Sequence, residues 1–161
     1  MIVISDTTAI SNLIQIGALN LLKDIYNEII IPTAVYNELL VLDSNELPVR
    51  KQLNQDWFKI ETVIKDSTFL SLSVELDIGE VEAITLAIQK KADYLLIDEK
   101  EGRKIAVEKE LKIIGTLGIL IEAKRRKLIE SVKTKMDDLM NIGFWINPKL
   151  YNKVIEIEQK L

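Results

Sequence analysis

The residues that could do chemistry in this sequence are mostly carboxylates, because the chain contains no His and no Cys. Without His there is no imidazole base for a Ser-His-Asp or Cys-His site and no histidine metal ligand. Without Cys there is no thiolate nucleophile, no cysteine zinc site and no disulfide. Any catalysis must therefore use carboxylates, Lys, Tyr, hydroxyls or a bound ion.

Two aspartates each stand at the end of a short apolar run. Asp6 follows the run at residues 2–4, and Asp98, with Glu99 beside it, follows the run at residues 94–97. In an open parallel α/β sheet, ligands bind beyond the carboxyl ends of the strands, so both positions point to one rim. Taken singly, each aspartate is better explained as a turn or helix N-cap residue, which is a common use of Asp.

A helical glutamate strengthens the case for a site. Glu80 follows Gly79 at a predicted helix start, and its spacing places it on one face with the apolar residues Ala83, Ile84, Ala87 and Ile88. We therefore expect a partly buried carboxylate, which needs a partner. The alternative is structural, because an acid near a helix N-terminus is stabilising by about 0.3–1 kcal/mol.

Glu38 lies in a predicted helix, residues 33–42, that is apolar nearly all round. We therefore do not expect its side chain to be freely solvated, although a surface Glu is the alternative. Glu82 falls on the flank of its helix with Leu86 and Gln89, and we expect it to be more solvated.

Four carboxylates at one rim would repel one another and raise some of their pKa values unless a cation joined them. A hard divalent ion such as Mg²⁺ takes oxygen ligands and keeps several waters, so a set without His or Cys suits it. Such a site is suited to phosphodiester hydrolysis.

The elements that must position these acids alternate between strand-like and helical patterns, which indicates an α/β fold with a parallel sheet. We expect one domain over residues 1–161. Strands are predicted at residues 2–4, 28–31, 58–63, 94–97 and 112–115. Helices are predicted at residues 9–16, 18–26, 33–42, 50–54, 80–91, 101–111, 117–127 and 131–142, and from Asn147–Pro148 onward. Residues 43–78 are the hardest to place, and residues 72–76 are expected to be irregular.

Composition indicates an ordinary globular protein of 161 residues with a net charge of −4, which argues against a general nucleic-acid-binding coat. The first residues lack the pattern of a signal peptide, and no apolar run reaches the roughly 20 residues of a membrane span. We expect a cytoplasmic protein with no membrane association.

In order and spacing, four segments together resemble a PIN domain: Val3-Ile4-Ser5-Asp6-Thr7-Thr8, Ile31-Pro32-Thr33-Ala34-Val35-Tyr36-Asn37-Glu38, Gly79-Glu80-Val81-Glu82-Ala83 and Leu95-Leu96-Ile97-Asp98-Glu99. Ile114-Gly115-Thr116-Leu117-Gly118, followed by Glu122-Ala123-Lys124-Arg125-Arg126, is similar to the prokaryotic DUF3368 subfamily. The resemblance implies a three-layer sandwich with a mainly parallel central sheet and a helical C-terminal extension.

The resemblance also implies a metal-dependent ribonuclease in which Asp6, Glu38, Glu80 and Asp98 or Glu99 hold Mg²⁺ or Mn²⁺. Asp98 is the favoured member of the last pair, and Glu80 stands where many PIN domains have Asp. Thr8 matches a small polar residue that steadies the first Asp.

For partners, the resemblance implies an RNA substrate, frequent homodimers and, in many members, a toxin role with a small antitoxin.

Basic residues suggest substrate contacts. Arg103, with Lys100 and Lys104, follows the Asp98 strand and could contact phosphates. The basic block at residues 124–127 is better explained as a solvated face near a helix C-terminus. Trp57, Phe144 and Trp145 show no base-stacking pattern and are expected in the core or an interface.

Two other functions compete with the nuclease. A flavodoxin-like phosphoacceptor domain would also place acids at strand ends, but it gives Glu38 and Glu80 no role. A catalytically idle PIN-like module that only binds a partner protein would keep the same residues. A phosphatase with an Asp-x-Asp nucleophile is excluded, because position 8 is Thr.

Overall fold

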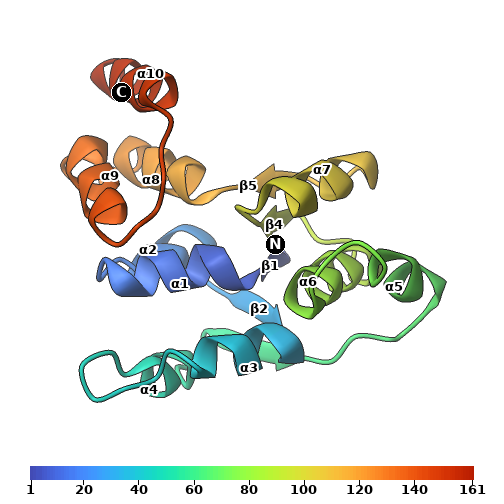
Figure 1. Cartoon of the computed structure of the whole chain (residues 1–161). Coiled ribbons are helices and arrows are strands. Elements are labelled where there is room, and N and C mark those ends of the chain that lie inside the picture. The colour runs from blue at the N-terminus through green and yellow to red at the C-terminus, as the bar shows by residue number, and fades with distance from the viewer.

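The computed structural model describes residues 1–161 and has a five-stranded, wholly parallel sheet in the order β3-β2-β1-β4-β5 (Figure 1). The strands are β1 (Val3–Ser5), β2 (Ile29–Pro32), β3 (Phe58–Glu61), β4 (Tyr94–Leu96) and β5 (Ile113–Ile114). The helices are α1 (Thr7–Gln15), α2 (Asn20–Tyr26), α3 (Thr33–Leu40), α4 (Val49–Leu53), α5 (Ser67–Leu72), α6 (Ile78–Gln89), α7 (Lys100–Glu108), α8 (Thr116–Arg125), α9 (Val132–Asn141) and α10 (Pro148–Gln159). The predicted α/β sandwich is confirmed.

Alternation of apolar side chains along the strands produces two cores, one on each face of the sheet. Val3, Ile29 and Ile31 belong to the larger core of 28 buried residues, which packs against helices that include α1, α2, α3, α8 and α9. Ile4 and Ile30 point the other way, into a core of 13 buried residues with α5, α6 and α7. Because successive residues of a strand face opposite sides, short β-branched runs are enough to build both layers.

Local capping explains where several helices begin. The side chains of Asp66, Asp77, Ser131 and Asn147 each accept a backbone N–H in the first turn of α5, α6, α9 and α10, respectively. Pro148 then occupies the start of α10, as its sequence predicted. Helix α5, whose first turn Asp66 caps, was not predicted.

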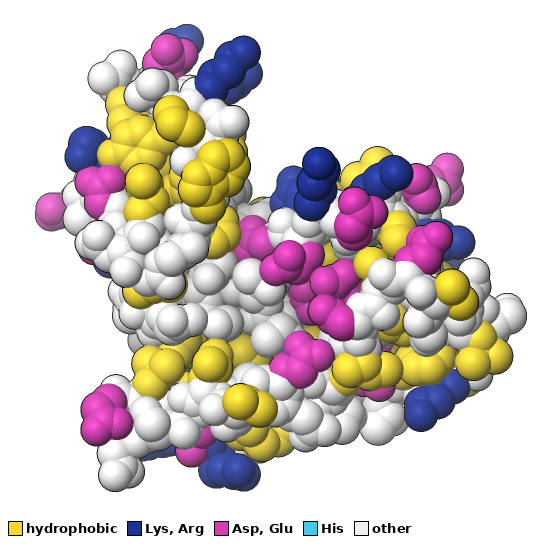
Figure 2. Space-filling view, in the orientation of Figure 1, with side chains coloured by type: hydrophobic (Ala, Val, Ile, Leu, Met, Phe, Trp, Pro, Cys, Tyr) yellow, Lys and Arg dark blue, Asp and Glu magenta, His cyan; other side chains and the backbone are white.

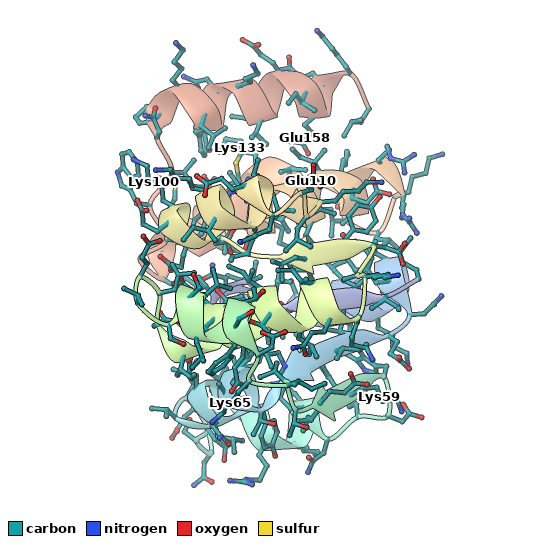
Figure 3. All side chains as sticks on the ribbon, turned by 90° about the vertical axis from the view of Figure 1, so that its right-hand side faces the viewer. Lys59, Lys65, Lys100, Glu110, Lys133 and Glu158 are labelled. Atoms are coloured by element: carbon teal, nitrogen blue, oxygen red, sulfur yellow. The ribbon has the colours of Figure 1, made fainter.

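The C-terminal extension is helical, as expected, and is tied together by polar contacts. Glu158 on α10 accepts the backbone N–H groups of Val132 and Lys133, which begin α9, and Figure 3 labels both Glu158 and Lys133 on this part of the chain. The Tyr151 hydroxyl of α10 donates to Asp137 at 2.7 Å. No helix in the structure combines the length and the hydrophobicity that a membrane crossing requires.

Four helices are followed by a non-glycine residue with positive φ, and Glu110, after α7, is one of them with φ of 62°. We expect Glu110→Gly to raise the free energy of unfolding by about 1 kcal/mol, because glycine adopts this conformation without a Cβ clash. Urea denaturation measures the change. Lys109→Gly is the matched control, since Lys109 has φ of −86° and glycine there should lower stability. Equal destabilisation by both variants would contradict the explanation.

Candidate metal-binding site at the carboxyl edge of the sheet

The parallel register brings the predicted acids to one edge of the sheet. Ser5 pairs with Leu96, so Asp6 and Asp98 leave neighbouring strands within about one residue of the same level. Helix α3, which carries Glu38, begins directly after β2, and α6, which carries Glu80, packs against α3, β1 and β2. Residues far apart in the chain therefore meet because β1 lies between β2 and β4.

Asp6 is buried, with 2% of its surface exposed. It holds the N-cap position of α1, yet its side chain makes no capping hydrogen bond, so helix capping does not explain it. Burial is the main cause that raises the pKa of Asp6 to about 7. The N–H of Thr7 opposes the rise, and the charges of Asp77, Glu38 and Glu99 add to it.

Glu80 is also buried, with 8% exposed, which confirms the prediction from its helical face. Burial is again the main cause of a raised pKa, here about 8, followed by the negative charges of Asp77 and Asp6. A capping role alone would not require burial among other acids. Glu80 is thus held in an environment that favours its neutral form or a cation beside it.

Glu38 is half-buried and accepts a hydrogen bond from the Thr7 hydroxyl at 2.6 Å, so it is not a freely solvated surface residue.

The prediction that Glu82 is more solvated is wrong. Glu82 is 9% exposed, and its carboxylate accepts the N–H of Ala34 at 2.9 Å. That N–H lies in the first turn of α3 and has no partner within the helix, so α6 supplies one.

Glycines make room for three of the acids. A Cβ at Gly79 would overlap the carboxylate of Glu38, and one at Gly102 would lie 3.1 Å from a Glu80 oxygen. At Gly115 the added carbon would lie 2.9 Å from a carboxylate oxygen of Asp98. Each acid therefore packs directly against a backbone segment of another element.

Asp98 has a structural task that Asp6 lacks. Its carboxylate accepts the backbone N–H of Thr116 at 2.8 Å, the Thr116 hydroxyl, and the Asn12 amide at 3.4 Å. Thr116 is the first residue of α8, so Asp98 caps that helix from the end of β4. The capping alternative thus applies to Asp98, although the helix it caps is not the one that follows it in sequence.

Glu99 is exposed and accepts the Thr8 hydroxyl at 3.2 Å. We expected Thr8 to steady Asp6; its side chain contacts Glu99 instead. The charge of Glu99 also helps to raise the pKa of both Asp6 and Glu80. Glu99 therefore faces the buried acids, whereas the carboxylate of Asp98 is turned toward α8.

Sequence reasoning missed Asp77 at this edge. Its carboxylate caps α6 by accepting the N–H of Glu80 at 3.0 Å, and its charge raises the pKa of Asp6 and Glu80. A signal was present in the sequence, because Asp three residues before Glu at the start of an apolar run is typical of a helix N-terminus.

Arg103 lies at the same edge, on α7. Its guanidinium donates to the Ile97 carbonyl at 3.0 Å, which ties it to the end of β4. A Cβ at Gly115 would lie 2.6 Å from the same guanidinium. The side chain is half-buried and sits beside Asp98, where a phosphate contact is the predicted role.

No basic side chain neutralises these acids. The four ion pairs of the structure join Lys90 to Glu61, Arg125 and Arg126 to Glu122, and Lys133 to Asp137. Figure 2 shows acidic side chains gathered in the hollow between the C-terminal helices and the α7 side of the molecule. No three of these acids are arranged as a ligand set for a metal ion in this structure.

The family comparison agrees with this geometry. The DUF3368 family model, described as a PIN domain, matches residues 2–160. The chain belongs to the PIN domain family. PIN domains are generally nucleases that act on nucleic acids and use divalent metals, so the family accounts for a rim of acids without bases. No curated protein and no solved structure matches the sequence significantly.

The donor set of this PIN domain fits a hard divalent cation. All the acids offer oxygen, the chain has no His or Cys to favour a softer metal, and burial, followed by the charges of neighbouring acids, raises the pKa of Asp6 and Glu80.

Without metal, the raised pKa values of Asp6 (about 7) and Glu80 (about 8) predict that stability falls as pH rises. The unfolded chain loses these two protons near pH 3.8 and 4.5, whereas the folded chain keeps them up to about pH 7 and 8. The free energy of unfolding therefore declines as the pH rises from about 4 to about 8. We expect Asp6→Asn to be more stable than the parent by on the order of 2 kcal/mol at pH 8, and equal to it near pH 4.

Urea denaturation in EDTA across that range measures the difference. Glu75→Gln is the control, because Glu75 is exposed and lies only two residues before Asp77. A constant difference between Asp6→Asn and the parent at all pH values would contradict the electrostatic explanation.

Proposed function

We propose that this protein is a metal-dependent endoribonuclease that hydrolyses phosphodiester bonds at the carboxyl edge of its sheet. The observation that carries the proposal is a rim of acids without a basic partner, two of them buried, in a PIN domain. Without counter-charges, these buried acids lower the stability of the fold. Such destabilising groups cluster at functional sites.

Asp6, Glu38 and Glu80 are the proposed core of the ligand set for Mg²⁺ or Mn²⁺. Asp6 is rigidly placed because it follows β1 directly, and the Thr7 hydroxyl orients Glu38. Asp77 holds the first turn of α6 and so fixes where Glu80 begins. A divalent cation bound here would lower the pKa of an attacking water and neutralise charge on the phosphoryl group.

Glu99, rather than Asp98, is the proposed fourth acid. Glu99 contributes to the raised pKa of both Asp6 and Glu80, and the only hydrogen bond to its carboxylate comes from Thr8. Both carboxylate oxygens of Asp98 already accept hydrogen bonds from Thr116 and Asn12. In this proposal Asp98 positions α8, and Arg103, which the Ile97 carbonyl holds, contacts a substrate phosphate through its guanidinium.

RNA as the substrate, a toxin role with a small antitoxin, a homodimer and a cytoplasmic location remain proposals that rest on the family resemblance. The phosphoacceptor alternative leaves Glu38 and Glu80 without a role, although both lie at the rim. An idle binding module is the outcome to be tested, because it would keep the same acids.

The first test is cleavage of a mixed pool of single-stranded and structured RNA with Mn²⁺ or Mg²⁺. We expect cleavage that EDTA abolishes and that Asp6→Asn reduces by at least about a hundredfold, since Asp6 is the most buried of the acids. Glu75→Gln should cleave like the parent. A folded parent that binds Mn²⁺ yet cleaves no RNA would favour the idle binding module.

The choice between the two neighbouring acids is tested by separating metal affinity from stability. We expect Glu99→Gln to weaken Mn²⁺ binding severalfold in calorimetry with little loss of stability. Asp98→Asn should instead lower the free energy of unfolding by about 1 kcal/mol, because it weakens the cap of α8. The reverse pattern would return Asp98 to the ligand set.

A further inference from the structure

A groove of about 850 Å³ lies between β5, α8 and α10 and is lined by 21 residues. Its floor includes Ile114 of β5 and Leu117 of α8, and its far wall includes Leu150 of α10. Asp98 and Arg103 line its other end, so the groove is continuous with the acidic rim. We call it the α8–α10 groove. Its volume is within the range of pockets that bury most of a bound ligand.

The α8–α10 groove is rich in positive charge within an acidic protein. Four basic side chains line it, namely Arg103, Arg125, Arg126 and Lys153, against the two acids Asp98 and Glu122, while the chain as a whole carries −4. Glu122 holds both Arg125 and Arg126 in place. Lys153 is exposed and makes no ion pair, so it is free to meet an anionic ligand.

The α8–α10 groove also contains an exposed aromatic side chain. Trp145 is 77% exposed, whereas Trp57 is 4% exposed and belongs to the core. Figure 2 shows apolar side chains on the C-terminal helices where they border the hollow that holds the acids. Aromatic faces beside a cationic track are the combination by which proteins bind single-stranded nucleic acid.

We propose that the α8–α10 groove binds an unpaired segment of the nucleic-acid substrate next to the cleaved bond, with a base stacked on Trp145. Lys153 and Arg103 contact the phosphates of that segment, and Asp98 marks where it reaches the rim. A duplex would not fit this role, because its base faces are already stacked. The inference rests on the proposed nuclease function and adds a preference for single strands to it.

The charge of the groove favours this occupant over an apolar protein segment. An apolar segment would cover Leu150 and Ile114 but would leave Arg103 and Lys153, which form no ion pair, without counter-charges. A strand of nucleic acid supplies both a flat apolar face and a regular series of negative charges. An acidic peptide is the competing ligand, and the experiment below includes one.

Binding is measured without metal, so that cleavage plays no part. A labelled single-stranded RNA of about eight nucleotides, within the usual length for such grooves, is titrated in EDTA. We expect Trp145→Ala to bind about tenfold more weakly than the parent, because stacking of one base contributes about 1–3 kcal/mol. Trp145→Phe should retain most of the affinity.

Two further comparisons isolate the groove. Lys153→Gln should weaken binding and reduce its salt dependence, whereas Lys59→Gln should do neither. Lys59 is exposed on β3, which is the opposite edge strand of the sheet, and Figure 3 shows it at the end of the molecule away from Lys133 and Glu158. RNA should also quench the fluorescence of the parent more than that of Trp145→Ala, which keeps only the buried Trp57.

Equal affinity of the parent and Trp145→Ala, equal binding of duplex and single strand, or no binding at low salt would each overturn the proposal. Quenching of Trp145 by a Glu- and Leu-rich peptide but not by RNA would overturn it in favour of a protein partner. These experiments distinguish failure of the proposed RNA-binding groove from failure of the proposed nuclease activity. If RNA binds as expected but Mn²⁺ produces no cleavage, only the proposed catalysis fails. If Trp145→Ala binds and cleaves like the parent, only the groove fails.

Discussion

Repulsion among carboxylates that have no basic neighbour is the constraint on which the arrangement of this protein depends. At separations of a few ångströms in a partly buried site, each like-charge pair costs several times what it would cost in water. Burial chiefly, and the charges of neighbouring acids in addition, raise the pKa of Asp6 and Glu80, and the surrounding elements hold both residues in place nonetheless. The central position of β1, the packing of α6 on α3 and the lack of side chains at Gly79 and Gly102 all serve that one placement.

At the same edge of the sheet, some acidic side chains accept hydrogen bonds that stabilise helix N-termini, whereas Asp6 accepts no such capping bond. Glu82 completes the first turn of α3, Asp77 that of α6, and Asp98 that of α8. Each of these contacts fixes the start of a helix at the rim. Asp6 holds an equivalent position before α1 but makes no such bond. Glu82, Asp77 and Asp98 thus stabilise the helices at this edge, and Asp6 keeps a carboxylate that caps no helix.

The elements and the general position of the acids were predictable, because both depend on local patterns. Buried strands such as Ile29–Pro32 are visible as β-branched runs, and the rule for the carboxyl ends of parallel strands then brings Asp6 near Asp98. The burial of Glu80 followed from helical spacing. These inferences need no knowledge of which strand lies next to which.

The missed features depend on partners that are distant in sequence. The solvation of Glu82 could not be judged without α3, whose first N–H it accepts 48 residues away. Asp98 was favoured over Glu99 as a metal ligand, and the contact of its carboxylate with Thr116, 18 residues later, is not visible in the sequence around it. Trp145 was expected in the core or an interface, and only the packing of α8 and α10 shows that it lines an open groove.

The two edge strands of the sheet, β3 and β5, affect the tendency of the protein to aggregate at high concentration. An open edge strand can recruit a strand from another molecule and so begin aggregation. Here β5 has only two residues, and β3 carries Lys59 and Glu61, of which Glu61 is paired with Lys90 of the α6 end at 2.8 Å. Neither edge therefore offers a long apolar template, and the sheet discourages uncontrolled self-association at both of its margins.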